Sequence, residues 1–456
     1  MTTKNSFYEG IFPHCADPSA PYVKSRYSVG DIQGLAFSLK ERLQPFAEKK
    51  STVCLWTEDR GLIMAALLAS LAGGPVFALP HAFSPQVIHE LQEICPVSVI
   101  LTDRDDVNFA GVERITPPDF RPAAALPTPL LDPQDTCLKL FTGGSTGTPR
   151  IWDKTPAGLL GESAFLARQF GICPEDVLLA AAPPQHIYGL LFSVILPFLA
   201  GARVLPETFS FPREIIAGIS RYCATILIGV PFIYRTLRLD TLERRSLRRA
   251  FSSAGKVNPE DAIFFKEKTG LPITEIYGST ETGGIAFQDS PDDRGRLQPF
   301  SEVSWEIAGE RLCVRSPFLS GNLPRDEEGF FITADRAVSL GPKNFKLLGR
   351  ADEVVKIAGK RVDLAEVQEK IQQIKGVQEA LVLALPEASG RRQEIVALVV
   401  GSLDRQMIRQ HLGDCLEPYA MPRHILRVAG IPVTPAGKID RRRIEEMLPS
   451  RKSEET

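Results

Sequence analysis

The sequence has little that would indicate a disulfide framework, a structural metal cluster or a polyelectrolyte partner. Its eight cysteines form no CxxC pair, so neither a zinc cluster nor a disulfide scaffold is expected. The 53 basic and 55 acidic residues nearly cancel, to a formal net charge of −2. This balance provides no overall attraction to nucleic acid or to an anionic membrane. We therefore expect small-molecule chemistry, and reduced thiols in a cytoplasmic location.

Long hydrophobic runs are also missing. The most apolar run, residues 62–72, has about half of the roughly 20 residues that a membrane-spanning helix needs. Gly73, Gly74 and Pro75 follow it and interrupt the pattern. The first residues, MTTKNSFYEGIFPHC, are charged and polar where a signal peptide would have an apolar core. We expect neither secretion nor stable insertion into a membrane.

Apolar strands and helices alternate along the larger, N-terminal part of the sequence. Strands are expected at residues 53–56, 75–79 and 97–102, with helices at residues 61–71 and 85–94 between them. Such alternation is typical of α/β proteins with a parallel sheet. With 456 residues and 44% hydrophobic content, the chain can form a large core and two or more domains.

Four further apolar segments are each expected to form a strand that ends in a polar loop: residues 177–182, 224–229, 250–253 and 274–277. Ligands of open parallel sheets bind at the carboxyl ends of the strands. We therefore expect the loops that carry His186, Gly255 and residues 277–284 to line one crevice, together with the segment at residues 140–150.

Residues 140–150, LFTGGSTGTPR, combine glycines, hydroxyl groups and one positive charge. Glycines let backbone amides turn inward, and hydroxyl donors and a guanidinium suit phosphate oxygens. The register fits neither GxxxxGK[ST] nor GxGxxG, so we predict a phosphate-binding loop of another kind. Taken alone, the stretch could also be a surface turn. The candidate phosphate-binding residues are Thr142, Gly143, Gly144, Ser145, Thr146, Gly147, Thr148 and Arg150.

The pattern changes near the C-terminus. From about residue 312 short strands and turns predominate, and residues 349–371 combine a charged turn, a short strand, a glycine turn and an amphipathic helix. Two apolar strands at residues 380–385 and 394–400, with two helices, predict a small α+β unit. We therefore expect two domains, residues 1–349 and residues 350–456.

Five segments, in this order, resemble the motifs of the adenylate-forming enzymes, which include acyl-CoA synthetases, aryl-CoA ligases and peptide-synthetase adenylation domains. LFTGGSTGTPR is similar to the phosphate loop, YGSTETGG to the adenine and metal motif, TADR to the ribose motif, GRADEVVKIAGKRV to the hinge and PVTPAGKIDRRRI to the final lysine motif. The resemblance spans nearly the whole chain. It implies a large N-terminal α/β domain with parallel-rich sheets and a small, mobile α+β C-terminal domain.

The resemblance implies an AMP-forming acid–thiol ligase. An aryl or medium-length acyl acid would react with ATP to give acyl-AMP and pyrophosphate. The acyl group would then pass to the thiol of CoA or of phosphopantetheine, which makes an acyl carrier protein a candidate partner. Mg²⁺ and a lysine ammonium would offset the negative charge that develops when the carboxylate attacks the α-phosphate.

The resemblance also assigns roles to residues that match its motifs. Tyr277 would stack on adenine, Thr280 would bind phosphate and Glu281 would hold Mg²⁺. Asp335 and Arg350 would bind the ribose hydroxyls. The other residues expected near the nucleotide are Gly255, Gly278 and Ser279.

Movement of the C-terminal domain is a second implication. Asp352 would be the hinge, and Lys438 would reach the reacting carboxylate from the small domain. After rotation, Gly359, Lys360 and Arg361 would lie near the arriving thiol.

The resemblance implies a catalytic role for His186, although a loop histidine can equally be a packing residue. With Tyr188, Gly189 and Val230 it would border the acyl pocket. This lining is mostly apolar or aromatic and has no evident counter-charge for an amine, so an amino-acid substrate is not expected.

Two residues depart from the family's pattern. Arg150 stands where lysine is usual, and Lys256 stands where proline or glutamate is common. A non-catalytic nucleotide-binding or regulatory homologue of the same fold is therefore the alternative. An adenylate-using oxygenase of the luciferase kind is a second one.

Overall fold

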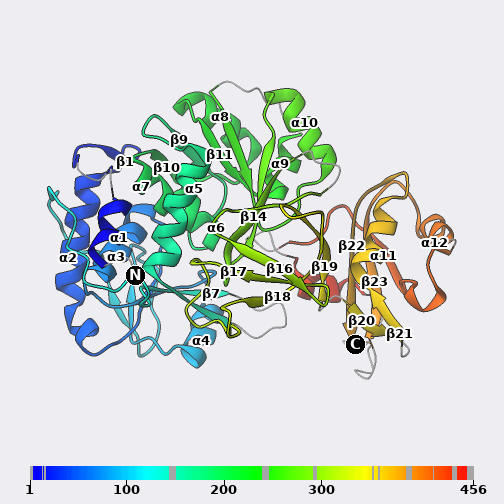
Figure 1. Ribbon diagram of the computed structural model, residues 1–456, viewed down its shortest axis with the longest axis horizontal. Helices are drawn as coiled ribbons and strands as arrows, with labels where there is room; N and C mark the ends of the chain where they lie inside the picture. The colour runs from blue at the N-terminus through cyan, green and yellow to red at the C-terminus, as the bar shows by residue number, and fades with distance from the viewer. Residues whose placement is uncertain are drawn as a thin grey trace. The chain divides into compact units, whose positions relative to one another are not determined.

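A computed structural model describes residues 4–12, 14, 17–142, 150–238, 246–290, 295–351, 354–357, 360–386, 393–413, 415–433 and 439–448 (Figure 1). By its internal contacts the chain divides into two compact units. The first comprises Met1–Ser304 with Arg315–Phe331, and the second comprises Trp305–Val314 with Ile332–Thr456. The domain boundary expected between residues 349 and 350 concerns motion, which internal contacts do not report, so it stays a prediction.

One sheet of the first unit has, among its described residues, six strands in the order β6-β5-β3-β4-β7-β8. Neighbouring strands run parallel, except that β7 and β8 pair antiparallel. The strands are β3 (Val53–Leu55), β4 (Phe77–Leu79), β5 (Val99–Leu101), β6 (Glu113–Ile115), β7 (Leu138–Thr142) and β8 (Arg150–Lys154). The three central strands β3, β4 and β5 are buried along their whole length, as their continuous apolar sequences predict.

The second sheet of this unit has nine strands in the described part of the chain, in the order β15-β14-β13-β12-β11-β9-β10-β1-β2. The six strands β13, β12, β11, β9, β10 and β1 run parallel to one another. At the edges, β14, β15 and β2 pair antiparallel. The strands are β1 (Pro21–Val23), β2 (Tyr27–Ser28), β9 (Val177–Ala180), β10 (Arg203–Thr208), β11 (Ile226–Gly229), β12 (Arg249–Ser252), β13 (Ile273–Ser279), β14 (Gly283–Ser290) and β15 (Gln298–Pro299). The alternating α/β fold expected from the sequence is confirmed.

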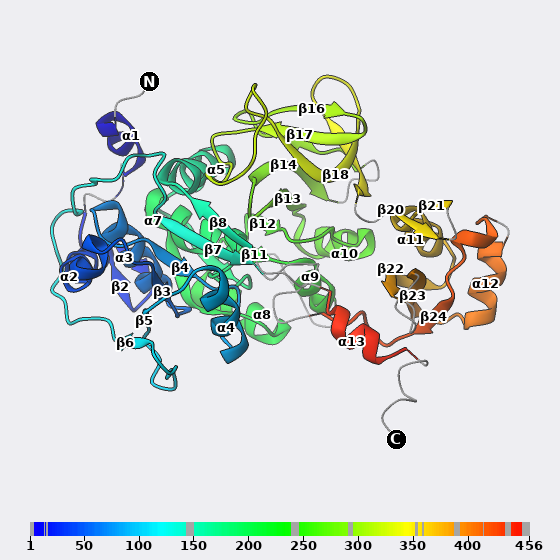
Figure 2. The same cartoon turned by 90° about the horizontal axis from the view of Figure 1, so that it is seen from below.

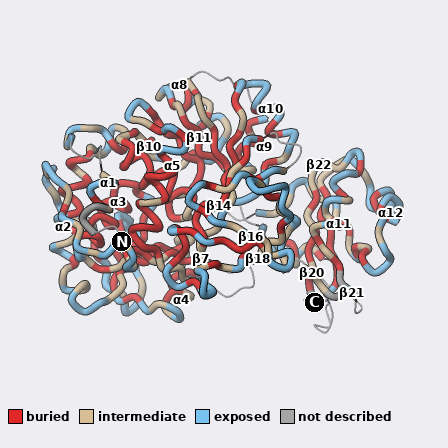
Figure 3. Tube along the Cα trace, viewed as in Figure 1, coloured by how far each residue is buried: buried red, intermediate tan, exposed pale blue. Residues whose placement is uncertain are grey.

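Helices cover both faces of the nine-stranded sheet (Figures 1 and 2). Ala250 of β12 belongs to a core cluster with residues of α8, α9 and α10, whereas the adjacent Phe251 contacts the rings of Phe170 and Phe192 on the opposite face. Figure 3 shows that the buried segments are concentrated in the strands and in the helices packed on them. The helices of the unit are α1 (Lys4–Ile11), α2 (Val29–Glu48), α3 (Arg60–Leu71), α4 (Pro85–Ile94), η1 (Ala157–Gly161), α5 (Glu162–Phe170), α6 (Ile187–Leu190), η2 (Leu191–Ile195), α7 (Leu196–Ala200), α8 (Pro212–Tyr222), α9 (Pro231–Leu237) and α10 (Pro259–Thr269).

The second unit is the small α+β part of the chain. A four-stranded sheet of β16 (Ser304–Ala308), β17 (Arg311–Arg315), β18 (Phe331–Ser339) and β19 (Phe345–Arg350) precedes the pair β20 (Val354–Ile357) and β21 (Lys360–Asp363). A three-stranded sheet follows, formed by β22 (Val377–Pro386), β23 (Gln393–Gly401) and β24 (His424–Arg427). Its helices are α11 (Leu364–Gln372), α12 (Arg405–Gly413), η4 (Pro418–Ala420) and α13 (Arg441–Glu446). The unit confirms the C-terminal α+β region, with β22 and β23 longer than the predicted strands.

Arg60 joins the two sheets of the first unit. It is the first residue of α3, which follows β3, and its side chain is buried. Its guanidinium donates to Ser193 Oγ at 3.3 Å, to Pro206 O at 2.7 Å and to Thr208 Oγ1 at 3.0 Å, all of which belong to η2 or β10. Burial lowers the pKa of Arg60 to about 10, so the side chain still carries its charge at neutral pH.

Replacing this guanidinium should destabilise the first unit. We expect Arg60→Met to lower the free energy of unfolding by ~2–4 kcal/mol, because one buried acceptor and two partly buried acceptors lose their donor. Denaturant titration followed by tryptophan fluorescence measures the change. As a control, Arg104→Met removes an exposed pair with Asp106 and should leave the midpoint unchanged. Equal midpoints for both variants would contradict the role assigned to Arg60.

Candidate functional site

The loops expected to meet at one edge of the sheet do follow neighbouring strands. β9, β11, β12 and β13 are adjacent and parallel, and Gly229 of β11 is level with Ser252 of β12, which is level with Glu275 of β13. Their carboxyl ends therefore lie at the same edge. The segments that carry His186, Val230, Gly255 and residues 277–284 all leave the sheet there. That they bind a ligand together stays a prediction.

The tight turn between β13 and β14 carries the candidate phosphate and metal residues. Ser279 pairs with Gly283 and Gly278 pairs with Gly284, so Thr280 and Glu281 occupy the tip. Thr282 Oγ1 accepts from Ser279 N at 3.1 Å and donates to Gly283 O at 2.9 Å. Hydroxyl groups of the turn itself thus hold its backbone.

The partly exposed position of Glu281 fits a magnesium ion held together with a nucleotide. Mg²⁺ prefers oxygen ligands, usually keeps several waters and needs only one or two carboxylates when phosphates complete its coordination. Among the described residues no group of three or more His, Cys, Asp or Glu side chains could hold a metal without such a substrate. Glu281, with the Thr280 hydroxyl beside it, has the donor type that a magnesium–phosphate complex requires.

Two hydrogen bonds that the sequence motifs did not indicate support this turn. Ser320 N donates to Glu281 O at 2.8 Å. Gly284 N donates to Glu162 Oε1 at 2.6 Å, and Glu162 itself is buried at the start of α5. Lys154, at the end of β8, is equally buried. The only sequence signal for the two charged residues was their position beside apolar segments.

The described ends of the phosphate-loop segment lie together. Thr142, the last residue of β7, pairs with Arg150, the first residue of β8. Trp152 Nε1 donates to Thr142 Oγ1 at 3.2 Å, and Arg150 is exposed. The remaining candidates lie outside the described residues: Gly143, Gly144, Ser145, Thr146, Gly147 and Thr148.

The His186 segment combines an accessible residue with two packed ones. His186 is half-buried and precedes α6, where its carbonyl accepts from Leu190 N at 2.7 Å. Tyr188 is buried with its ring 5.0 Å from that of Phe192. A Cβ on Gly189 would lie 1.9 Å from Pro183 O, so only glycine allows this close approach. Tyr188 and Gly189 therefore have packing roles, whatever else they contact.

The other two candidates of this edge differ in their surroundings. Val230 precedes α9 and packs, partly buried, against the core that α8, α9 and α10 form with the sheet. Gly255 lies in the exposed segment after β12, and a Cβ there would make only an ordinary contact, 3.6 Å from Pro231. Gly255 is thus not required for packing.

In the second unit the two ribose candidates are cross-strand partners. Asp335 of β18 pairs with Arg350 of β19, and Arg350 Nη1 lies 3.8 Å from Asp335 Oδ1. Lys360 begins β21 opposite Ile357 and is exposed. Arg361 follows it in the same strand. Three further candidates, Asp352, Gly359 and Lys438, lie outside the described residues.

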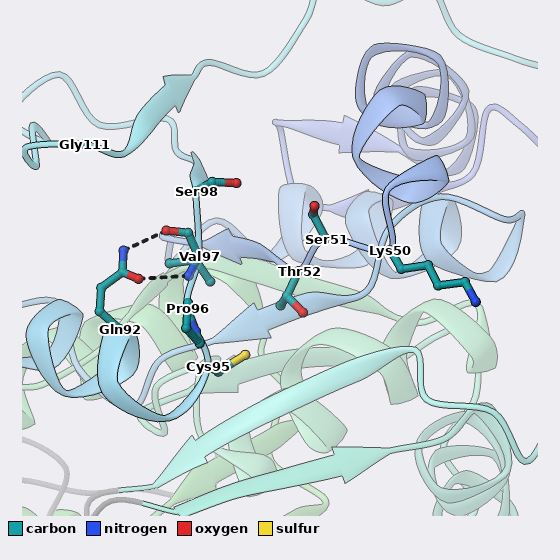
Figure 4. Close-up of a pocket in the computed structure, with 9 residues that line it drawn as sticks. All are labelled: Lys50, Ser51, Thr52, Gln92, Cys95, Pro96, Val97, Ser98 and Gly111. Carbon is teal, nitrogen blue, oxygen red and sulfur yellow. Dashed lines mark hydrogen bonds between the residues drawn. The ribbon is translucent and has the colours of Figure 1, made fainter.

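The six-stranded sheet has a hollow at the ends of its strands opposite to those where ligands of parallel sheets bind. It lies beside Lys50–Thr52 and Cys95–Ser98, which precede β3 and β5, so it is at the amino ends of parallel strands (Figure 4). Gln92, one of the polar residues of its lining, donates to Val97 O at 2.7 Å and accepts from Val97 N at 3.0 Å. Its hydrogen-bonding capacity thus already serves the local fold.

The close approach at Gly278 makes the turn testable. In Gly278→Ala the new Cβ would lie 2.2 Å from Gly283 O, which is backbone, so the start of β14 must shift, and the Thr280–Glu281 turn that joins it to β13 must shift with it. We expect ATP affinity to fall ~10-fold or more, because small displacements of positioning groups are costly. Isothermal titration of the folded variant with Mg²⁺–ATP measures this. Gly10→Ala, with open space around its Cβ, is the control; equal affinities would exclude the turn from the site.

Comparisons with known proteins agree with these motifs. The family model described as AMP-binding enzyme matches residues 48–341, and the model for the AMP-binding enzyme C-terminal domain matches residues 366–438. The anthranilate–CoA ligase of Pseudomonas aeruginosa is 24% identical over 98% of this chain and 97% of its own length. The mitochondrial acyl-coenzyme A synthetase ACSM2 of Rattus norvegicus is 26% identical, over 68% of this chain and 61% of its own length.

The same architecture occurs in solved structures. ATP-bound MatB from Rhodopseudomonas palustris superposes with a TM-score of 0.81 at 21% identity, covering 98% of this chain and 99% of that one. The o-succinylbenzoate CoA synthetase of Bacillus subtilis in complex with ATP and magnesium ion has a TM-score of 0.75 at 18% identity, covering 92% and 94%. No helix in the described part of our chain has the length and apolar character to span a bilayer. From the family match over more than half of its length, the chain belongs to the AMP-binding enzyme family, the AMP-forming acid–thiol ligases.

Proposed function

We propose that the chain activates a small carboxylic acid, aryl or medium-length acyl, to acyl-AMP with release of pyrophosphate. It then transfers the acyl group to the thiol of CoA or of a carrier protein's phosphopantetheine. The observation that carries the proposal is the turn between β13 and β14, which presents Thr280 and Glu281 at the sheet edge that follows β9, β11 and β12. Adenylation and thioester formation are typical of the family.

Each group in the first half-reaction has a role that its chemistry supports. Bound Mg²⁺ would offset the charge of the phosphates and of the leaving pyrophosphate. Glu281 would hold the ion, the Thr280 hydroxyl would donate to a phosphate oxygen, and Tyr277 would stack on adenine. The Lys438 ammonium would lie against the reacting carboxylate and stabilise the negative charge of the transition state.

The phosphates and the ribose would be bound by further residues. Thr142 and Arg150, paired at the ends of β7 and β8, would bind phosphate oxygens, since a guanidinium binds phosphate as well as an ammonium does. Asp335 would accept from a ribose hydroxyl. Its proximity to Arg350 supports a shared ribose site, because the arginine can orient the carboxylate while donating to the sugar itself.

The acyl acid would lie near His186 and Val230, with the buried Tyr188 behind them. The candidate lining is mostly apolar or aromatic, which favours an apolar acyl group over an amino acid. The similarity to an anthranilate–CoA ligase supports an aryl acid as one substrate class. His186 would border this pocket and control access to it.

The second half-reaction would use the same site after rotation of the C-terminal domain about Asp352. Lys360 lies at the exposed start of β21, where it could meet the phosphates of an arriving CoA or carrier arm. Gly359 and Arg361 would flank it. The cytoplasmic location expected from the cysteine pattern is part of the same proposal.

The reaction predicts carboxylate-dependent exchange of labelled pyrophosphate into ATP. We expect exchange with aryl or medium-length acids, and a loss of ~10²-fold in Glu281→Gln, which keeps the size of the side chain but not its charge. A panel of carboxylic acids that includes amino acids measures both activity and preference. ATP binding without exchange for any acid would favour the non-catalytic homologue, and exchange with amino acids alone would contradict the pocket assignment.

Domain rotation predicts that Lys438 serves only one half-reaction. Lys438→Ala should lower adenylation ~10²-fold or more, because it removes transition-state charge stabilisation. The rate of thioester formation from supplied acyl-AMP should remain within ~3-fold of the rate of the unaltered chain. Single-turnover assays of the two half-reactions separate these effects. Equal losses in both would refute the division of labour.

A further inference from the structure

Lys154 is a buried lysine that none of the proposed steps uses. It ends β8 with 1% of its surface exposed, whereas lysine side chains usually reach solvent. Its backbone is fixed, since Cys137 N donates to Lys154 O at 2.9 Å. Its Nζ has no hydrogen-bond partner among the described residues. Burial lowers the pKa of Lys154, and attraction first to Glu162 and then to Glu281 opposes this effect.

Glu162 provides the opposite charge and contacts the backbone of the site. Its Oε1 accepts from Gly284 N at 2.6 Å, and it is also 1% exposed. A Cβ on Gly283 would lie 2.5 Å from Oε2, so the carboxylate rests directly against the first residues of β14. Burial raises the pKa of Glu162, while the attraction of Lys154 and then the Gly284 hydrogen bond oppose the rise.

The strand that carries Lys154 is also linked to Glu281 through the segment at residues 318–321. Gly321 N donates to Asp153 O at 2.9 Å, next to Lys154 in sequence. The adjacent Ser320 N donates to Glu281 O at 2.8 Å. The backbone of the turn is therefore held from two sides, by Glu162 at Gly284 and by Ser320 at Glu281.

We propose that Lys154 and Glu162 are positioning residues, whose opposite buried charges hold the Thr280–Glu281 turn in the geometry that Mg²⁺–ATP binding requires. Glu162 fixes the start of β14 through Gly284, and Lys154 provides the buried positive charge that balances Glu162. Neither contacts the substrate. The inference rests on the proposed function only in naming Mg²⁺–ATP as the ligand of the turn.

The test compares ATP affinity with Mg²⁺ and with EDTA, by isothermal titration of the full chain. Lys154→Met removes the ammonium and keeps an unbranched side chain. We expect its Kd for ATP to rise ~10-fold or more with Mg²⁺, as for other residues that orient metal ligands, and ~2-fold or less with EDTA. Lys139→Met is the matched control, because Lys139 lies in the adjacent β7 and pairs at 2.7 Å with the Asp153 side chain, not with the Asp153 O that accepts from Gly321 N. It should bind as the unaltered chain does.

A double variant separates positioning from simple loss of packing. Lys154→Met/Glu162→Gln keeps an acceptor for Gly284 N and leaves no unbalanced buried charge. Its Kd for ATP with Mg²⁺ should be ~3-fold or more lower than that of Lys154→Met. It should still be higher than the Kd of the unaltered chain. If Lys154→Met melts below the assay temperature, the double variant decides alone: a Kd equal to that of the unaltered chain would overturn the proposal.

Further outcomes would also test the positioning role of Lys154 and Glu162. Equal weakening of ATP binding with Mg²⁺ and with EDTA, or the same loss in Lys139→Met, would show that the pair has only a structural role. Absence of any Mg²⁺-dependent affinity in the unaltered chain would overturn the inference. Absence of pyrophosphate exchange with Mg²⁺-dependent binding intact would overturn the proposed function and leave the inference supported.

Discussion

The parallel hydrogen-bond register of β9, β11, β12 and β13 is the constraint on which the candidate site depends. Because parallel strands must all be entered from the same side, each of them ends at the same edge, and every connection there begins beside its neighbours. Residues that are far apart in sequence, such as His186 and Thr280, are thereby placed at one edge of the sheet. The register of the sheet thus determines where the site lies, and the residues in the loops determine what it can bind.

Much of this arrangement could be predicted because it depends on apolar patterns. The strands at residues 53–56, 97–102 and 224–229 are continuous apolar runs, and they form β3, β5 and β11 with bounds that differ by only a few residues. The family was indicated by the order of its motifs, since each motif alone is a short polar segment with several explanations. The roles of the individual motif residues stay predictions, and those of Asp352 and Lys438 concern positions outside the described residues.

The parts that escaped prediction are those in which tertiary contacts override local preference. β8 has the sequence RIWDK, whose polar residues do not indicate a strand, and it forms by pairing with β7. Arg60, Lys154 and Glu162 are charged residues, for which exposure is the ordinary expectation, yet all three are buried. Only the packing of distant segments, such as β10 on α3, provides the partners that make such burial tolerable.

The antiparallel pairing of β7 with β8 has a consequence for how this chain can vary. Successive side chains of a strand point to opposite faces, so the side of the sheet that Lys154 occupies depends on its register opposite Leu138. Substitutions at the exposed Arg150 leave that register intact. Loss or gain of one residue within β8 would instead turn the lysine to the opposite face and bring a neighbour with different chemistry into the core. Homologous chains should therefore tolerate changes of residue type in this strand far better than changes of its length.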